Sequence, residues 1–176
     1  MDLFAANGFD GVSIADIAGA AGVSQGALYR HYPSKEELAW ALFSTAYLRT
    51  GEELDRIRTG TVEFEAAVMA MTAHFCALYD ADPALFRFML ITQHGFLPRI
   101  PSGSRTPVDA VADLVSDAVA KNRLKPVDPA LGAAVIMGVI LQSATFHIYG
   151  RLRGSLGARV PGLARAAIAA VAALTQ

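Results

Sequence analysis

The sequence predicts an all-α protein, and three observations support this fold class. Apolar residues recur with a period near 3.6 along the 176-residue chain, as they do in amphipathic helices. No stretch alternates apolar and polar residues between hairpin turns, as half-buried strands do. Helix-start signals recur along the chain. The composition, 53% hydrophobic and 18% charged, suits a packed core and excludes intrinsic disorder.

The first start signals are serines that precede a carboxylate by three residues. Ser13 with Asp16 and Ser34 with Glu37 have the spacing of a capping box. In this motif the serine side chain accepts from a backbone amide of the first turn, and the carboxylate accepts from the serine amide. Each pair therefore predicts the start of a helix.

Three later helices are predicted to begin at a proline. Asp82-Pro83, Thr106-Pro107 and Asp128-Pro129 each place a capping oxygen before a proline at the first helical position, where the missing amide hydrogen costs nothing. Together with glycine and proline breaks, these starts divide the chain into about nine helices.

The segment 107–123 shows the helical period clearly. Val108, Val111, Val115 and Ala118 fall on one predicted face, which we expect in the core. The opposite face, which we expect in water, carries Asp109, Asp113 and Asp117.

Residues 13–32, SIADIAGAAGVSQGALYRHY, predict two short helices joined by a tight turn. The first runs from Ser13 to Ala21, and Gly22 supplies the positive φ that such a turn needs. Ser24 caps the second helix, whose Leu28 and Tyr32 face inward. This layout is a helix-turn-helix whose second helix enters the major groove of DNA.

The exposed face of that second helix carries groups that suit base recognition. Gln25 lies in the first turn and can pair bidentately with adenine, while Gly26 leaves room for close approach. Tyr29, one turn later, offers a ring to a thymine methyl and a hydroxyl to a base or phosphate. Further candidates for contacts with the phosphate backbone are Ser13, His31 and Lys35.

Residues 3–47 resemble the DNA-binding domain of the TetR family of bacterial transcriptional regulators. The resemblance lies in the runs GFDGVSIADIA, AGVSQGALY and PSKEEL. It implies a helical homodimer that binds a palindromic operator and releases it when a small ligand enters the C-terminal domain. It also implies base contacts by Gln25, Gly26 and Tyr29. The positions matched to phosphates or their surroundings are Ser13, Ser24, His31 and Lys35.

We therefore expect two domains: a helix-turn-helix DNA-binding domain of three helices at 1–47, and a ligand-binding and dimerisation domain at 48–176. Family members carry further residues ahead of LFAANGF, so the stub Met1 to Asn7 gives a truncated first helix of at most two turns. Either the chain starts late within its gene, or the DNA-binding domain is weakened by the loss of apolar contacts.

Residues 129–150 are uncharged and long enough to span a bilayer. Polar side chains in the C-terminal half, and glycines that suit close helix packing, favour a soluble, buried helix without membrane contact. With the alanine-rich 161–174 it is predicted to form the homodimer interface as a four-helix bundle.

Methionines and aromatic residues of 62–80, 83–94 and 129–150 are predicted to line a pocket for a small apolar or aromatic effector, although each of them also suits a helical core. The candidate contacts are Phe75, Tyr79, Met89, His94, Phe96, Phe146 and His147.

The sequence offers no catalytic constellation and no metal-ligand motif, so we expect neither an enzyme nor a cofactor. Cys76 is predicted to be a buried structural thiol, since no basic residue lies beside it in sequence. The single cysteine and the lack of a signal peptide after Met1 predict a cytoplasmic protein. With a net charge of −1 and no basic arm, DNA binding has to rest on the motif.

The C-terminal region is nevertheless basic, through Arg151, Arg153, Arg159 and Arg165. Two interpretations are open: a second nucleic-acid surface, or a solvated rim that complements helix dipoles and keeps an alanine-rich bundle soluble. The solvated rim is the simpler interpretation.

These features predict a ligand-responsive transcriptional regulator, in the first instance a repressor, that binds a palindromic operator as a homodimer. Two alternatives remain. One is a membrane-tethered DNA-binding sensor, and the other is a helical ligand-binding or interaction dimer that lacks DNA binding because its first helix is short.

Overall fold

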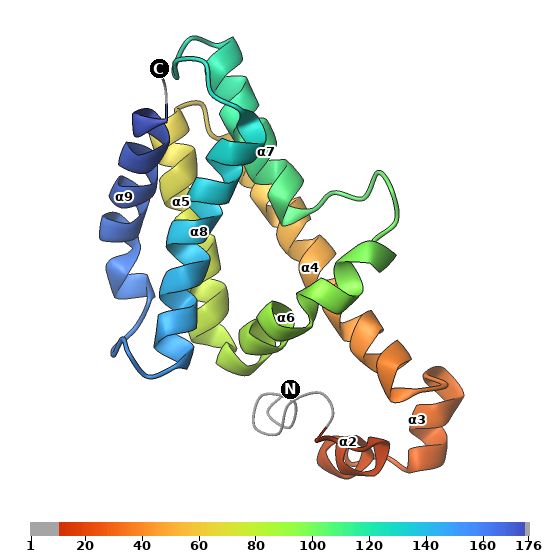
Figure 1. The fold of residues 1–176 in the computed structure, drawn as a ribbon. Helices are drawn as coiled ribbons and strands as arrows, with labels where there is room; N and C mark the ends of the chain where they lie inside the picture. Colours follow the sequence, from red (N-terminus) through yellow and green to blue (C-terminus); the bar gives the residue numbers. More distant parts are fainter. Residues whose placement is uncertain (1–10, 175–176) are drawn as a thin grey trace. The chain divides into compact units, whose positions relative to one another are not determined.

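The computed structural model describes residues 11–174, and within that range every regular element is a helix. The first helices in this range are α2 (Ile14–Ala21), α3 (Gln25–His31), α4 (Lys35–Gly60), α5 (Phe64–Ala81) and α6 (Pro83–Phe96). They are followed by α7 (Pro107–Ala120), α8 (Pro129–Ile148) and α9 (Val160–Ala173), with short 3-10 helices η1 (Leu97–Arg99) and η2 (Gly157–Arg159) (Figure 1). The predicted all-α class is confirmed. The expected first helix at Met1 to Asn7 lies outside the described residues.

Most of the predicted start signals cap helices. Thr106 caps α7 within a full capping box: its Oγ1 accepts from the Asp109 amide at 3.2 Å, and the Asp109 carboxylate accepts from the Thr106 amide at 3.2 Å. The sequence analysis predicted the Thr106-Pro107 start but not the part played by Asp109. Ser34 Oγ accepts from the Glu37 amide at 3.1 Å, and the Asp128 carboxylate accepts from the amide of Ala130 at 2.9 Å.

The fold divides into two compact units. Unit 1 contains the described residues up to Tyr47 together with 84–104, and unit 2 contains 48–83 together with 105–174. One boundary falls inside α4, so this helix contributes many residues to each unit. The predicted assignment of DNA binding to 1–47 and of ligand binding to 48–176 concerns function and stays a prediction.

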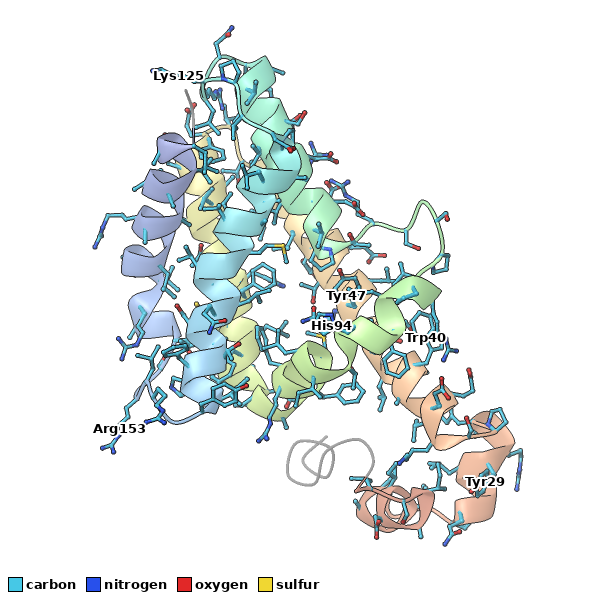
Figure 2. The ribbon with its side chains drawn as sticks, viewed as in Figure 1. Tyr29, Trp40, Tyr47, His94, Lys125 and Arg153 are labelled. Atoms are coloured by element: carbon cyan, nitrogen blue, oxygen red, sulfur yellow. The ribbon has the colours of Figure 1, made fainter. Side chains whose placement is uncertain are left out.

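Unit 1 is held together by aromatic packing between the first half of α4 and α6. Phe43 is fully buried, with ring centroids 5.2 Å from Tyr47 and 5.4 Å from Phe96. Trp40 packs on Phe96 at 5.9 Å. Figure 2 shows Trp40 on α4 beside α6. Burial of each large aromatic side chain contributes about 2 kcal/mol, so α6 is an integral part of this unit.

Unit 2 is built from α5, α7, α8 and α9. α5 packs against α9, and α8 packs against both α7 and α9 (Figure 1). Gly132 allows the close approach of α8 to α7, because a Cβ there would lie 2.9 Å from Val115 Cγ1. Gly51 on α4 meets the chain just before α7 more closely still: its Cβ would lie 2.2 Å from the Arg105 carbonyl oxygen.

The structure corrects two details of the α7 pattern. Val111, Val115 and Ala118 are buried as predicted, but Val108 is 45% exposed because the buried face is centred on other residues of the helix, including Ala110 and Leu114. The acidic face is also not simply solvated. Its second and third carboxylates accept hydrogen bonds at 2.6 Å from arginines outside the helix: Asp113 from Arg105, and Asp117 from Arg58.

In the single protomer, the predicted burial of 129–150 is seen for one face of α8, and burial of its other face in a dimer stays a prediction. The buried face includes Ile136 and Ile140, and the helix packs against α5, α7 and α9. The other face is exposed along Leu131, Ala134, Gly138, Gln142 and Phe146. Within residues 11–174, α8 alone is long and apolar enough to cross a membrane, judged by length and composition only.

Candidate nucleic-acid interface

The helix-turn-helix forms through local caps and one glycine turn. Ser13 caps α2 in a reciprocal box, in which its Oγ accepts from the Asp16 amide at 3.2 Å and Asp16 accepts from the Ser13 amide at 2.8 Å. Gly22 ends α2 with a φ of 67°, a left-handed conformation that favours glycine. Ser24 then starts α3, where its Oγ accepts from the Ala27 amide at 3.1 Å. These interactions confirm the turn predicted from the sequence.

The second helix, α3, presents its polar face to solvent. None of its seven residues is buried, and Tyr29 is 50% exposed. Gln25 and Gly26 are exposed beside it in the first turn, and the space where a Gly26 Cβ would lie is open for 4 Å. Leu28 is half-buried, as expected for the inward face. Figure 2 marks Tyr29 on this helix. The three predicted base-contacting positions therefore share one accessible surface.

The predicted phosphate contacts differ in their surroundings. His31 and Ser24 are exposed, and Lys35 is half-buried at the start of α4. Ser13 is already engaged, because its hydroxyl donates to the Asp16 carboxylate at 2.6 Å. That hydrogen bond, together with the one from the Ser13 amide, lowers the pKa of Asp16. A negative charge thus occupies the position at Ser13 where a phosphate was predicted, which leaves the other three as the better candidates.

Arg99 is a residue of this unit that the sequence analysis missed. Its guanidinium pairs with Glu37 at 2.8 Å and Glu36 at 3.5 Å, and lies 4.6 Å from the centre of the Trp40 ring. It therefore balances two carboxylates in the first turn of α4, five and six residues after the end of α3. No local sequence signal reveals this role, because 62 residues separate Arg99 from Glu37.

Two of the predicted effector contacts in unit 2, Tyr79 and His147, form a hydrogen bond with each other. Phe75 and Tyr79 are buried on α5. The Tyr79 hydroxyl lies 2.9 Å from Nδ1 of His147, and Nε2 of His147 contacts the Gly154 carbonyl. Because a carbonyl only accepts, Nε2 carries a hydrogen, and in the Nε2–H tautomer Nδ1 accepts from Tyr79. Phe146, also on α8, is 46% exposed.

The remaining predicted effector contacts lie in unit 1. Phe96 is buried among Trp40 and Phe43, and Met89 packs against the same cluster. His94 is exposed on α6, where Figure 2 labels it. The structure thus brings together Tyr79 and His147, places Met89 with Phe96, and assigns the two groups to different units.

Two further features of unit 2 concern chemistry. Cys76 is 1% exposed, and its burial, with the nearby Asp80, raises the pKa of the thiol to about 11; the predicted buried thiol is confirmed.

A shallow hollow that the sequence did not predict is lined by Arg58, Thr61, Val62, Phe64, Leu114, Asp117, Ala118, Lys121 and Arg123. Across residues 11–174, the His, Cys, Asp and Glu side chains do not gather into a group that would hold a metal ion.

Comparison with known proteins places this architecture among bacterial regulators. The family model for bacterial regulatory proteins of the tetR family matches residues 1–42. CymR, an HTH-type transcriptional regulator of Pseudomonas putida, is 31% identical over 150 residues, which cover 84% of this chain and 68% of CymR. MftR of Mycobacterium tuberculosis, by name a mycofactocin biosynthesis transcriptional regulator, is 46% identical over 57 residues, which cover 32% of this chain and only 29% of MftR.

Solved structures share the fold at lower identity. The fatty acid degradation regulator FadR from Bacillus halodurans superposes with a TM-score of 0.83 at 18% identity, over 94% of this chain and 88% of FadR. AibR, crystallised with isovaleryl coenzyme A and operator DNA, gives a TM-score of 0.68 at 22% identity, over 93% of this chain and 90% of AibR.

Proposed function

Because this chain belongs to the TetR family of bacterial regulatory proteins, we propose that it is a repressor that binds a palindromic operator as a homodimer and releases it when a small effector binds. The observation that carries the proposal is the accessible face of α3. Gln25, Gly26 and Tyr29 are all exposed on this helix, which Ser24 caps at its N-terminus. Gln25 and Tyr29 read base edges in the major groove. Ser24, His31 and Lys35 contact the flanking phosphates.

The homodimer interface is proposed on the exposed faces of α8 and α9. On α8 this face carries Leu131, Ala134, Gly138 and Phe146, spaced at helical intervals, with Leu131 and Phe146 about half exposed. Most exposed residues of α9 are small, although Pro161 and Arg165 are exposed on this helix as well; the small ones are Gly162, Ala166, Ala169, Ala172 and Ala173. Two copies of these faces close a four-helix bundle, in which small residues permit close approach and the large apolar side chains fill the seam.

The same observations favour a cytoplasmic dimer over a membrane anchor. The buried face of α8 packs on three helices, with Gly132 seated against Val115, so a bilayer-spanning α8 would have to leave this core. Solubility of the protein without detergent, and recovery from the soluble fraction, test this choice directly.

The proposed effector is small and mainly apolar, and it acts through α4. This helix carries residues of both units, and three residues separate its start from the end of α3. Two recognition helices must lie about 34–36 Å apart to enter successive major grooves. An effector that changes the course of α4 spoils that spacing and lowers operator affinity by the ratio of its own affinities for the two states.

The test is a fluorescence anisotropy titration with duplex DNA from immediately upstream of the gene, repeated over a range of salt concentrations. Tyr29→Ala is expected to weaken binding about 10- to 100-fold, the range for a contact that reads a base. The matched control is Ile91→Ala, since Ile91 is also exposed in unit 1, at 54%, but belongs to α6. Both variants should unfold at the wild-type temperature. Wild-type operator affinity in Tyr29→Ala contradicts the assignment of α3 to the groove.

A further inference from the structure

The connection between α8 and α9 is held in one conformation by residues of α5. The Asp80 carboxylate accepts from the Ser155 hydroxyl at 2.6 Å, the Leu156 amide at 3.0 Å and the Gly157 amide at 2.8 Å. Burial acts to raise the pKa of Asp80, but these three hydrogen bonds outweigh it and the pKa is lowered. The Asp80 carboxylate therefore uses most of its acceptor positions on the backbone and serine of this connection.

A second tie runs through His147 at the end of α8. Its ring links the Tyr79 hydroxyl on α5 to the Gly154 carbonyl in the connection. Gly150, with a φ of 69°, turns the chain back so that the Arg151 amide donates to the Phe146 carbonyl at 2.8 Å. The connection is thus a fixed platform rather than a loose loop.

Four arginines project from this platform and the helix that follows it. Arg151, Arg153, Arg159 and Arg165 are all exposed, and the sequence has no acidic residue from 149 to 165. Arg159 Nη2 donates to the Arg153 carbonyl at 2.8 Å, which brings these two residues together. The Asp80 carboxylate keeps its negative charge beside the connection, but the four guanidinium groups outnumber it.

The helix dipole accounts for only part of this arrangement. Arg151 follows the C-terminus of α8, where a cation is favourable. Arg159 and Arg165 instead lie at the start of α9, the positive end of that dipole. A protein that needed solubility alone would gain more from acidic residues at this end.

We propose that the arginines of the α8–α9 connection form a binding surface for phosphate groups. The guanidinium group is planar and presents paired donors that match phosphate oxygens, which makes a cluster of arginines selective for this chemistry. Tyr149, 71% exposed at the start of the same connection, adds a ring on which a nucleobase can stack. The phosphates belong either to the DNA backbone or to a phosphorylated small molecule. This surface is separate from α3, so the proposal stands or falls independently of operator recognition.

The test compares two double variants that remove equal charge from opposite ends of unit 2. Arg151→Gln with Arg153→Gln alters the platform and keeps Arg159, which supports it, and Arg165, which lies on α9. Lys121→Gln with Lys125→Gln is the control; Figure 2 shows Lys125 and Arg153 at opposite ends of α8, which is about 30 Å long. Both pairs are exposed, so the thermal unfolding temperature and the elution volume should match the wild type.

The probes are inorganic pyrophosphate, titrated by calorimetry, and a 20-base-pair duplex of random sequence, titrated by anisotropy against salt. The arginine variant should bind one of them about tenfold more weakly, while the lysine variant changes less than about twofold. If the ligand is DNA, the slope of log K against log salt also falls by about 0.9 for each lost contact. If the ligand is a small phosphorylated molecule, only pyrophosphate binding falls. Equal behaviour of the two variants, or no loss with either probe, overturns the proposal.

Discussion

α3 and α5 show two ways in which a helix of this protein uses its residues. None of the seven residues of α3 is buried, whereas eight of the 18 residues of α5 are. α3 is positioned by its caps and the glycine turn before it, and its exposed face is available for recognition. α5 is positioned by the packing of its buried side chains in the core of unit 2. Substitutions in unit 2 should therefore act mainly on stability, and substitutions on α3 mainly on binding.

The largest effect should come from the backbone contact of Gly51 in unit 2. Gly51→Ala places a Cβ 2.2 Å from the Arg105 carbonyl, so backbone must move, and we expect a loss of about 3 kcal/mol or more in the free energy of unfolding. Gly60→Ala in the same helix meets nothing within 4 Å and should be neutral or slightly stabilising. Urea unfolding of both variants measures the difference. Equal stability of the two variants would show that the backbone at Arg105 can move to accept a side chain at position 51 without loss of stability.

The contrast between α3 and α8 explains what the sequence alone could predict. The Ser13 and Ser24 caps and the Gly22 turn are local, so each could be placed to the residue. The sidedness of α8 could not, because an uncharged run of alanine, glycine and aliphatic residues carries no polar face to mark the solvent side. Pairings across the fold were equally hidden: the sequence analysis selected Tyr79 and His147 as effector contacts but could not show that they bond each other across 68 residues.

The next prediction concerns the exposed face of α8, where a substitution in unit 2 should affect dimerisation rather than the stability of the protomer. Phe146→Asp should leave the protomer folded, since the side chain is 46% exposed, but raise the dimer dissociation constant about 100-fold or more by placing two carboxylates at the seam. Analytical ultracentrifugation measures this. Val62→Asp, at 71% exposure between α4 and α5, is the control. If the Phe146→Asp variant still forms the dimer but no longer responds to effector, Phe146 contacts the effector rather than the partner protomer.

A smaller effect is expected from the ion-pair network that joins α4 to the start of α7. Burial acts to raise the pKa of Asp55, but hydrogen bonds from Arg58 and Arg105 outweigh it and the pKa is lowered. A carboxylate with a lowered pKa stabilises the fold above its unfolded pKa of about 3.9 and loses that contribution as the pH falls further. Asp55→Asn should therefore cost about 1–2 kcal/mol at pH 7 and progressively less below about pH 4.

Unfolding curves from pH 3 to pH 7 measure this difference for Asp55→Asn and for Glu65→Gln, an exposed carboxylate on α5. The glutamate variant should follow the wild type throughout. A difference between Asp55→Asn and the wild type that stays constant down to pH 3 would mean that the arginines do not depend on the charge of Asp55.

The smallest effect, that of a glycine substitution on α3, tests the contrast between α3 and α5 most sharply. The free energy of unfolding should rise while operator affinity falls. Gly26→Ala on α3 fills space that is open for 4 Å, and alanine favours a helix over glycine by up to about 1 kcal/mol, so the free energy of unfolding should rise slightly. Operator affinity should fall, since the added methyl occupies the surface that approaches the bases. Gly19→Ala on α2, equally open, should give the same gain in stability without the loss of affinity. If both variants bind the operator as the wild type does, close approach of α3 to the bases does not require the glycine, and recognition then depends on Gln25 and Tyr29.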